Sequence, residues 1–307
     1  MTVVVIGAGS IGKRHFGNLE TLGVKARLVG WRAFRPADLE GASAVVIATA
    51  TQVRAEIVTL CAARELPFYV EKPLAYRADD LAHMMTIAAP LAERCLVGFM
   101  MRYHPAFRDL AQMDLSGVYG FSLEIGHDVR QWRQNWSFAG SYAARPEGGG
   151  VLLDLCHELD MAHCLFPDVG LRGVDALGHA DFAGVDFASR IALAGGGAQG
   201  TVAMDYLSPV SLRRIALRGT GGTVDLDFIG GTLVMDSGQG AQARDWTFER
   251  NDMFLDAMRD FLALVDGRAT SDIDHLPRLD RVGTSCALIA QAWEARRFSG
   301  MITGDYP

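Results

Sequence analysis

Two ionisable side chains, Asp154 and His157, lie three residues apart in the segment GGGVLLDLCHELD (148–160). Side chains at this spacing on a helix are neighbours, and an imidazole beside a carboxylate is suited to act as a general base near neutral pH. The leucines fall on the opposite face, so the pattern also fits an amphipathic helix with a solvated polar face. We predict a single helix whose polar side is either an acid–base pair or a solvent face.

The same segment contains two partial metal-binding patterns. HELDM begins like the metalloprotease motif HExxH, but Met161 stands where the second histidine is needed. Cys156, Asp160 and Cys164 share one side of the predicted helix, yet their spacing matches no structural zinc pattern. Buried thiols explain these cysteines better, and we predict no metal.

A third candidate, Lys72, lies in LPFYVEKPLA (66–75), which predicts a strand ending at Val70 or Glu71. Pro73 disfavours a helical conformation at Lys72, which should therefore lie in a loop after the strand. Open α/β sheets bind ligands at the carboxyl ends of their strands, and an ammonium group there could stabilise a developing alkoxide. The alternative is an exposed loop lysine paired with Glu71.

The elements that would position these residues begin with VVVIGAGSIGKRH near the N-terminus. Val3–Ile6 predict a strand buried on both faces. Gly7, Gly9 and Gly12 follow in GxGxxG spacing and lead into a predicted helix. Such glycines permit a tight turn and close approach to a pyrophosphate at the helix N-terminus, so we predict a dinucleotide-binding turn.

The second predicted strand, Lys25–Val29, lacks the acidic residue that usually follows it and binds the ribose hydroxyls. Arg32 and Arg35 lie in that region instead. An arginine without the carboxylate favours the 2′-phosphate of NADP, although Arg32 could equally be an ordinary surface arginine. The expected cofactor is therefore NADP or NAD, with NADP preferred.

The remaining pattern divides the chain into two predicted domains. Strands and helices alternate over residues 1–101, which predicts an α/β Rossmann domain with a doubly wound parallel sheet. From Gly117 onward, short alternating segments separated by glycines predict an α+β domain over 102–307 with an open, mainly antiparallel sheet. Helices are expected near Asn251–Val265 and Pro277–Phe298, the second able to pack back on the first domain.

Composition limits the partners. The 307 residues carry a formal net charge of −7, without the concentrated basic surface typical of nucleic-acid binding. The five cysteines are scattered, no signal peptide follows Met1, and charged residues and a proline interrupt the apolar stretch Leu81–Met101. We expect a cytoplasmic protein with a small-molecule partner and neither nucleic acid nor membrane as a partner.

As a whole, the chain resembles the Gfo/Idh/MocA family of NAD(P)-dependent oxidoreductases. The resemblance covers residues 1 to about 166 and is carried by VVVIGAGSIGKRH, VVIATAT, VEKPLA, VGFMMRYHPAF and SYAARPEGGGVLLDLCHELD. It implies a sugar, nucleotide-sugar or cyclitol substrate and a homodimer or tetramer formed through the second sheet. The family's EKP lysine falls on Lys72, and its helix aspartate and histidine fall on Asp154 and His157.

Three features depart from the family pattern. His157 follows Asp154 by three residues instead of four, which leaves their division of labour open. The segment between Trp31 and Ser43 is too short for the usual helix and third strand. Arg54 stands where the family's TPxxxH motif has its histidine, so cofactor orientation could differ.

The predicted reaction is reversible hydride transfer between a carbinol carbon of a sugar-like substrate and C4 of nicotinamide. Either His157 or Lys72 accepts the hydroxyl proton, and Asp154 orients His157 or binds a neighbouring hydroxyl. Two other functions stay open: a binding protein that senses NAD(P) or a sugar without turnover, and a reductase of a non-sugar imine or enone.

The remaining candidate site residues are contacts. The segment QWRQNWSFAGSYAARPE (131–147) is rich in polar and aromatic residues suited to a hydroxyl-rich ligand. We predict Arg102, Tyr142 and Arg145 as substrate contacts. The predicted cofactor contacts are Gly7, Gly9, Ser10, Ile11, Gly12, Arg32, Thr49, Thr51 and Glu71.

Overall fold

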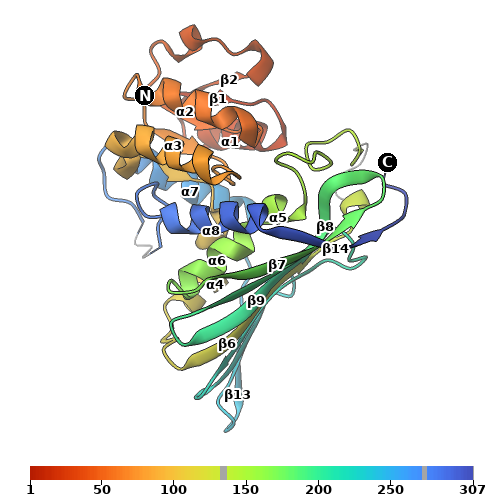
Figure 1. The fold of residues 1–307 in the computed structure, drawn as a ribbon. Helices are drawn as coiled ribbons and strands as arrows, with labels where there is room; N and C mark the ends of the chain where they lie inside the picture. Colours follow the sequence, from red (N-terminus) through yellow and green to blue (C-terminus); the bar gives the residue numbers. More distant parts are fainter. Residues whose placement is uncertain (132–136, 272–274, 307) are drawn as a thin grey trace. The chain divides into compact units, whose positions relative to one another are not determined.

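The computed structural model describes residues 1–131, 137–271 and 275–306. Its internal contacts divide the chain into two compact units. One comprises Met1–His104 and Phe248–Ala287, and the other comprises Pro105–Thr247 and Leu288–Pro307. Each unit is built around its own sheet (Figure 1).

The first unit contains a five-stranded parallel sheet in the order β2-β1-β3-β4-β5. Its strands are β1 (Thr2–Ile6), β2 (Lys25–Val29), β3 (Ala44–Ile47), β4 (Phe68–Val70) and β5 (Leu96–Val97). Its helices are α1 (Ser10–Thr21), α2 (Arg54–Ala62), α3 (Ala78–Ala88), α7 (Arg250–Val265), η1 (Trp31–Ala33), η2 (Pro36–Leu39), η3 (Thr51–Val53), η4 (Ala89–Arg94) and η5 (Met100–Tyr103). The apolar runs of β1 and β3 are fully buried from Val3 and Ala44 onward, which confirms the predicted Rossmann-type sheet.

Strand order reverses at β1, because β2 pairs with one side of it and β3 with the other. In open α/β sheets this reversal marks the ligand crevice at the carboxyl ends of the strands. Between β2 and β3 the chain forms only η1 and η2, and no strand is found in that described segment. This agrees with the short spacing between Trp31 and Ser43.

The second unit contains a nine-stranded sheet in the order β13-β12-β11-β10-β6-β9-β8-β7-β14. Its strands are β6 (Val118–Gly126), β7 (Gly170–His179), β8 (Phe182–Gly195), β9 (Ala198–Asp205), β10 (Leu212–Gly219), β11 (Gly222–Asp227), β12 (Thr232–Asp236), β13 (Ala241–Asp245) and β14 (Arg296–Ile302). All pairs are antiparallel except β6–β9 and β7–β14, which confirms the predicted mainly antiparallel sheet. Its short helices are α4 (Pro105–Ala111), η6 (Val129–Gln131), α5 (Val151–Asp154) and α6 (His157–Leu165), and α8 (Gly283–Glu294) crosses the division between the units.

Helix α6 packs on one face of this sheet, where β6 and β9 contribute Leu123 and Val202, both fully buried. The ring of Phe166, just after α6, stacks on Phe121 of β6 with ring centroids 4.5 Å apart. This packing holds the segment that carries Asp154 and His157 against the sheet.

Two element predictions are wrong. The single helix expected over residues 151–166 is two helices, because the chain leaves helical geometry at Leu155 (φ −105°, ψ 25°). The final predicted helix ends at Glu294, and Arg296–Ile302 form strand β14 instead. β-branched or aromatic residues are sparse in RRFSGMI, so tertiary pairing with β7 decides its conformation.

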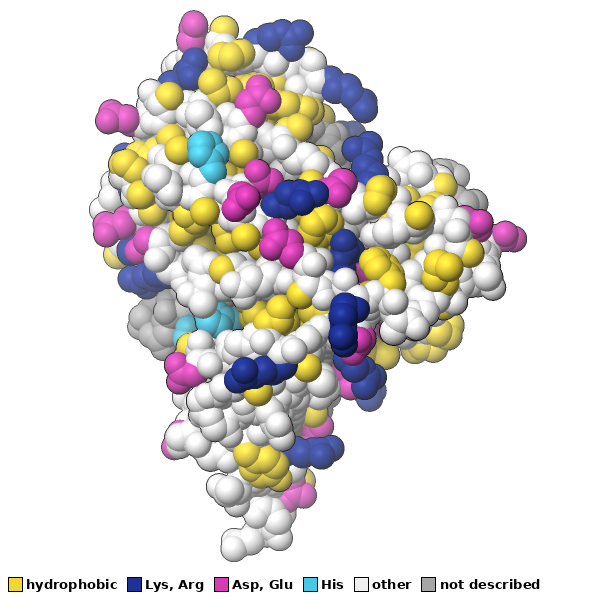
Figure 2. Space-filling model, in the orientation of Figure 1, with side chains coloured by type: hydrophobic (Ala, Val, Ile, Leu, Met, Phe, Trp, Pro, Cys, Tyr) yellow, Lys and Arg dark blue, Asp and Glu magenta, His cyan; other side chains and the backbone are white. Residues whose placement is uncertain are grey.

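On the face drawn in Figure 2, Lys and Arg side chains lie interspersed with Asp and Glu side chains. Within the described part of the chain, no helix has the length and apolar character needed to cross a membrane.

Candidate functional site

Three loops of the first unit lie at the carboxyl ends of its parallel strands. The glycine turn Gly7–Gly12 follows β1, Thr49–Thr51 follow β3, and Lys72 follows β4. Since all five strands run in one direction, their carboxyl ends gather these loops beside the reversal of strand order. The predicted cofactor contacts and the candidate lysine are thus brought to one edge.

The glycine turn has the form of a pyrophosphate cradle. A Cβ at Gly7 would lie 2.3 Å from Ala48 O, and one at Gly12 would lie 1.7 Å from Gly7 O, so both positions must be glycine for the turn to pack. A Cβ at Gly9 would meet no atom within 4 Å. Gly9 also caps α1 without a side-chain hydrogen bond, which leaves first-turn N–H groups to bind an anion. The turn therefore fits a dinucleotide.

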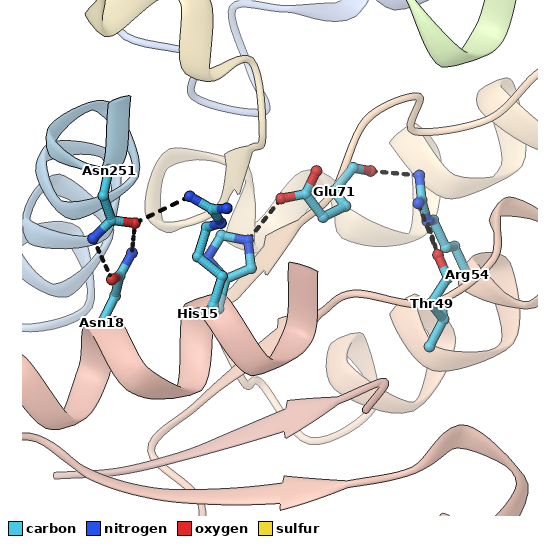
Figure 3. Close-up of polar contacts among 7 residues, drawn as sticks. His15, Asn18, Thr49, Arg54, Glu71 and Asn251 are labelled. Carbon is cyan, nitrogen blue, oxygen red and sulfur yellow. Dashed lines mark hydrogen bonds and ion pairs between the residues drawn. The ribbon is translucent and has the colours of Figure 1, made fainter. Parts of the chain in front are cut away.

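Arg54, at the start of α2, links the loops that follow β3 and β4 by hydrogen bonds to their main-chain carbonyl oxygens. Its guanidinium is buried and donates to Thr49 O at 2.8 Å and to the carbonyl oxygen of Glu71 (Figure 3). It also donates to the carbonyl oxygen of Pro73. Five N–H groups in a rigid fork allow arginine to bind several carbonyls at once, which a histidine at this position could not do. Lys72 lies between two of the residues that Arg54 binds.

Glu71 directs its carboxylate into the unit. His15 Nε2, on α1, lies 2.7 Å from Glu71 Oε1, and both side chains are buried (Figure 3). Burial alone would raise the pKa of Glu71, but the hydrogen bond and charge of His15, with smaller contributions from Lys72 and Arg54, hold it below its usual value. The carboxylate is therefore ionised near neutral pH and accepts the Nε2 proton of His15. Glu71 thus forms a buried hydrogen-bonded pair with His15.

Arg32 and Arg35 lie beyond the carboxyl end of β2, in and after η1. Both are exposed, and Arg35 donates to the carbonyl oxygens of Arg32 and Phe34. The rings of Trp31 and Phe34 stack at 5.9 Å. The arginine-rich segment is thus a compact turn at the edge of the sheet.

In the second unit, two tyrosines hold the carboxylate of Asp154. Tyr142 donates to Oδ1 at 2.6 Å and Tyr206 donates to Oδ2 at 3.0 Å. Burial, followed by the charge of Asp154, raises the pKa of Tyr206 well above its usual value, so its hydroxyl stays protonated and donates. Both carboxylate oxygens therefore have a phenol donor, and the side chain is fixed in orientation.

Asp186 of β8 holds the start of α5, the helix that ends at Asp154. Its fully buried carboxylate accepts from Leu152 N at 3.0 Å, from Ser189 Oγ at 2.7 Å and from the Arg296 guanidinium. Gly150 precedes the helix with φ +90°, and a Cβ there would lie 2.0 Å from Asp186 Oδ1. The carboxylate thus acts as a helix cap supplied by a distant strand.

The polar side chains of α6 do not form a solvated face. His157, Glu158 and Asp160 are all buried, and Glu158 Oε1 accepts from Arg213 of β10 at 2.6 Å. His127 directly follows β6. Burial lowers the pKa of its imidazole, and the negative charge of Asp154 opposes part of this lowering. The solvent-face interpretation is therefore wrong, and these ionisable groups belong to a polar interior.

The predicted substrate contacts fall in different environments. Tyr142 is 45% exposed and binds Asp154, and Arg145 is exposed in the same loop. Arg102 is buried in the first unit, where it donates to His275 O at 3.0 Å and to Ser285 Oγ at 3.3 Å. Residues 132–136 of the aromatic segment lie outside the described residues.

Known proteins give two kinds of match, and no family model matches the chain. The sequence is 28% identical over 205 residues to Inositol 2-dehydrogenase 2 of Saccharopolyspora erythraea, covering 58% of this chain and 57% of that protein. The chain thus aligns with little more than half the length of this relative.

Two solved structures align over nearly the whole chain. One is UDP-N-acetylglucosamine 3-dehydrogenase from Acidithiobacillus ferrooxidans, with a TM-score of 0.77, 19% identity and coverage of 96% of this chain and 95% of that chain. The other is a mutant 3-ketoreductase from Actinomadura kijaniata, with a TM-score of 0.76, 17% identity and 99% coverage of both chains. The chain therefore has the same fold as these two oxidoreductases. At such identities the agreement concerns the fold.

Sequence reasoning missed three residues that hold the candidates in place, His15, Tyr206 and Asp186, and it named Arg54 without its partners. His15 ends the motif VVVIGAGSIGKRH, and Arg54 stands at a position where the sequence departs from the family pattern, but neither pattern indicates the partners of these side chains. Tyr206 and Asp186 lie 52 and 34 residues from the atoms they bind in α5, and no local pattern links them. In the described residues, no group of three or more His, Cys, Asp or Glu side chains could hold a metal.

Proposed function

We propose that this protein transfers a hydride between a nicotinamide cofactor and a carbinol carbon of a sugar, nucleotide sugar or cyclitol. The observation that carries the proposal is the first sheet, where the glycine turn after β1, Thr49–Thr51 after β3 and the Lys72 loop after β4 lie at the carboxyl ends of three successive parallel strands. The similarity to an inositol dehydrogenase, a nucleotide-sugar dehydrogenase and a ketoreductase supports the substrate class.

The cofactor would be held by the glycine turn, by Thr49 and Thr51, and by the N-terminus of α1; when bound, it supplies the site that accepts or donates the hydride. We favour NADP because β2 is followed by Arg32 and Arg35 instead of an acidic residue. The similar ketoreductase structure contains NADP, which agrees with this preference. NAD remains the alternative.

On the protein side, Lys72 would bind and polarise the substrate oxygen, and its ammonium would stabilise the alkoxide that develops as the hydride leaves. The hydroxyl proton would pass to His157; in the alternative assignment Lys72 is a neutral amine and accepts the proton itself. Asp154, with both oxygens bound by tyrosines, would orient the substrate or His157, and Tyr142 and Arg145 would contact the substrate.

The proposed organisation is a dinucleotide-binding domain and a substrate domain, working in the cytoplasm as a homo-oligomer. The second unit has a broad sheet whose one face carries α6. We propose that its other face joins copies of the chain. On that face, side chains such as Thr201, Ala203 and Ala216 are small enough to allow flat packing.

A substrate screen with a matched lysine variant tests the function. Inositols, sugars, uronates and nucleotide sugars are incubated with NADP or NAD, and absorbance at 340 nm is followed. Lys72→Ala should lower kcat by about 100-fold or more, because the group that stabilises the alkoxide is lost, with cofactor affinity nearly unchanged.

Lys25→Ala is the control, since Lys25 is exposed at the start of β2, and it should keep full activity. Near-normal turnover in Lys72→Ala would refute the chemical role of Lys72. Tight cofactor binding with no turnover on any substrate would favour the sensing protein instead.

A further inference from the structure

We propose that Tyr306 is a positioning residue: its ring supports Tyr206, the phenol that holds one oxygen of Asp154. The support passes through an aromatic cluster in the second unit. This aromatic cluster consists of the rings of Phe138, His179, Phe182, Phe187, Tyr206 and Tyr306. The effect of Tyr306 on Tyr206 can be tested by itself, and only its consequence for turnover rests on the proposed function.

The chain that follows β14 is held beside β7 and β8 by a buried histidine. His179, at the end of β7, has its Nε2 3.0 Å from Gly304 O. Because Asp181 N donates to His179 Nδ1 at 3.1 Å, that nitrogen carries no proton, and Nε2 donates to Gly304. This hydrogen bond leads the chain back to β8, where Tyr306 lies near the end marked C (Figure 1).

The ring of Tyr306 is fixed by two aromatic rings and by a guanidinium. Its centroid lies 4.9 Å from that of Phe187 and 6.1 Å from that of Phe138, and both pairs are edge-to-face. The guanidinium of Arg130 lies over the Tyr306 ring, 5.0 Å from its centroid. Arg130 is fixed in turn, since its Nε and Nη2 donate to the two oxygens of Asp128 at 2.9 and 2.7 Å. Tyr306 is therefore an ordered part of the aromatic cluster.

The two rings that contact Tyr306 also cover Tyr206. Phe138 lies 5.8 Å and Phe187 6.1 Å from the Tyr206 centroid, again edge-to-face. Tyr206 is fully buried, and its hydroxyl donates to Asp154 Oδ2 at 3.0 Å. Burial raises the pKa of Tyr206 well above its usual value, so the rings that exclude water also keep this hydroxyl a donor. Tyr306 is thus separated by a single layer of rings from the group that orients Asp154.

Loss of the Tyr306 ring would leave a gap beside Phe138 and Phe187. Because protein interiors are close-packed, neighbouring rings move to fill such a gap. Tyr306 is itself half-buried, so the gap would also be open to water. Both effects would expose Tyr206 and loosen its hydrogen bond to Asp154.

Fluorine NMR of protein labelled with 3-fluorotyrosine follows Tyr206 directly, because the sequence contains only seven tyrosines. Tyr206→Phe assigns the Tyr206 signal by its loss, and the change in chemical shift between H₂O and D₂O measures the contact of each ring with solvent. We expect no such change for the fully buried Tyr206 of the wild type. In Tyr306→Ala, the Tyr206 signal should acquire a change in the direction shown by Tyr119, which is 53% exposed. Tyr306→Phe keeps the ring and should behave as the wild type.

Phe166→Ala is the matched control, because it removes a ring from the same unit at a distance from Tyr206. Phe166 stacks on Phe121, which pairs with Gly200 of β9, and the extended chain from Gly200 to Tyr206 spans about 20 Å. Urea unfolding measures the stability lost in each variant, and Phe166→Ala should lose stability without exposing Tyr206. Tyr306→Val, which removes less volume, replaces Tyr306→Ala if that variant does not fold.

A Tyr206 signal that stays insensitive to solvent in the folded Tyr306→Ala protein would overturn the proposal, as would equal exposure of Tyr206 in Phe166→Ala or Tyr306→Phe. Because this readout uses neither cofactor nor substrate, a failed substrate screen leaves the result decisive. If a substrate is found, Tyr306→Ala should lower kcat by about tenfold or more with cofactor affinity nearly unchanged, and Tyr306→Phe should keep the wild-type kcat. An unchanged kcat in Tyr306→Ala would refute the positioning role.

Discussion

At the scale of single residues, the first unit keeps a charged carboxylate in its interior, and His15 makes this possible. Burial raises the pKa of Glu71, but the hydrogen bond and charge of His15, together with the charges of Lys72 and Arg54, hold it below its usual value. A group with a lowered folded-state pKa contributes stability above its unfolded pKa, near the ordinary value of 4.5. That contribution is lost as the pH falls through the folded-state pKa.

The prediction is a stability difference that depends on pH between the wild type and Glu71→Gln. The amide of the Glu71→Gln variant can still accept from His15 but carries no charge, so the wild type should be the more stable at pH 6 to 7 and lose this advantage below about pH 4.5. Urea unfolding of both proteins at several pH values from 7 to 3 measures it. A difference that stays constant across this range would contradict the assigned ionisation of Glu71.

At the scale of elements, sequence reasoning succeeded where one local pattern decides the structure. The run Val3–Ile6 followed by three glycines predicted β1, the turn and α1, and all three are present. It failed at α5 and α6, where the apolar spacing of one continuous helix conceals the break at Leu155. The break arises from packing: Asp186 holds the start of α5 and the β10 arginine Arg213 holds Glu158 at the start of α6.

The glycine turn yields a matched pair of variants. Gly9→Ala points a methyl into open space, so the free energy of unfolding should barely change, while the methyl should obstruct the pyrophosphate and weaken NADP binding by about tenfold or more. Gly12→Ala places its methyl against Gly7 O and should destabilise the unit by roughly 2–3 kcal/mol.

Thermal unfolding and cofactor titration by fluorescence separate the two effects. Loss of stability in Gly9→Ala, or unchanged NADP affinity in a folded Gly9→Ala protein, would argue against a pyrophosphate at this turn. Full stability in Gly12→Ala would show that α1 can shift away from the turn.

At the scale of the molecule, the candidate residues depend on partners far along the chain. Asp154 is held by Tyr206, 52 residues later, and α5 is anchored by Asp186, itself paired with Arg296. The family resemblance placed Lys72, Asp154 and His157, but it ended near residue 166 and so contained neither Tyr206 nor Arg296. Hydrophobic patterning also predicted a helix over Arg296, whereas the observed strand β14 brings it to Asp186. Contacts of this range follow from the assembled sheet, which local periodicity does not encode.

Arg296 and Arg297 are adjacent on β14 and allow the importance of this distant anchor to be measured. Arg296 is buried with the fully buried Asp186, so Arg296→Met would leave an uncompensated charge and should cost about 3 kcal/mol of stability. Arg297 is 79% exposed and approaches Asp175 only to 3.4 Å, so Arg297→Met should change stability little. Because Asp186 also caps α5, Arg296→Met should in addition disturb Asp154 and lower kcat. Adding Asp186→Asn to Arg296→Met removes the unpaired charge and should restore part of the lost stability. Urea unfolding of the three variants measures the stability terms, and equal effects of Arg296→Met and Arg297→Met would refute the role of the buried pair.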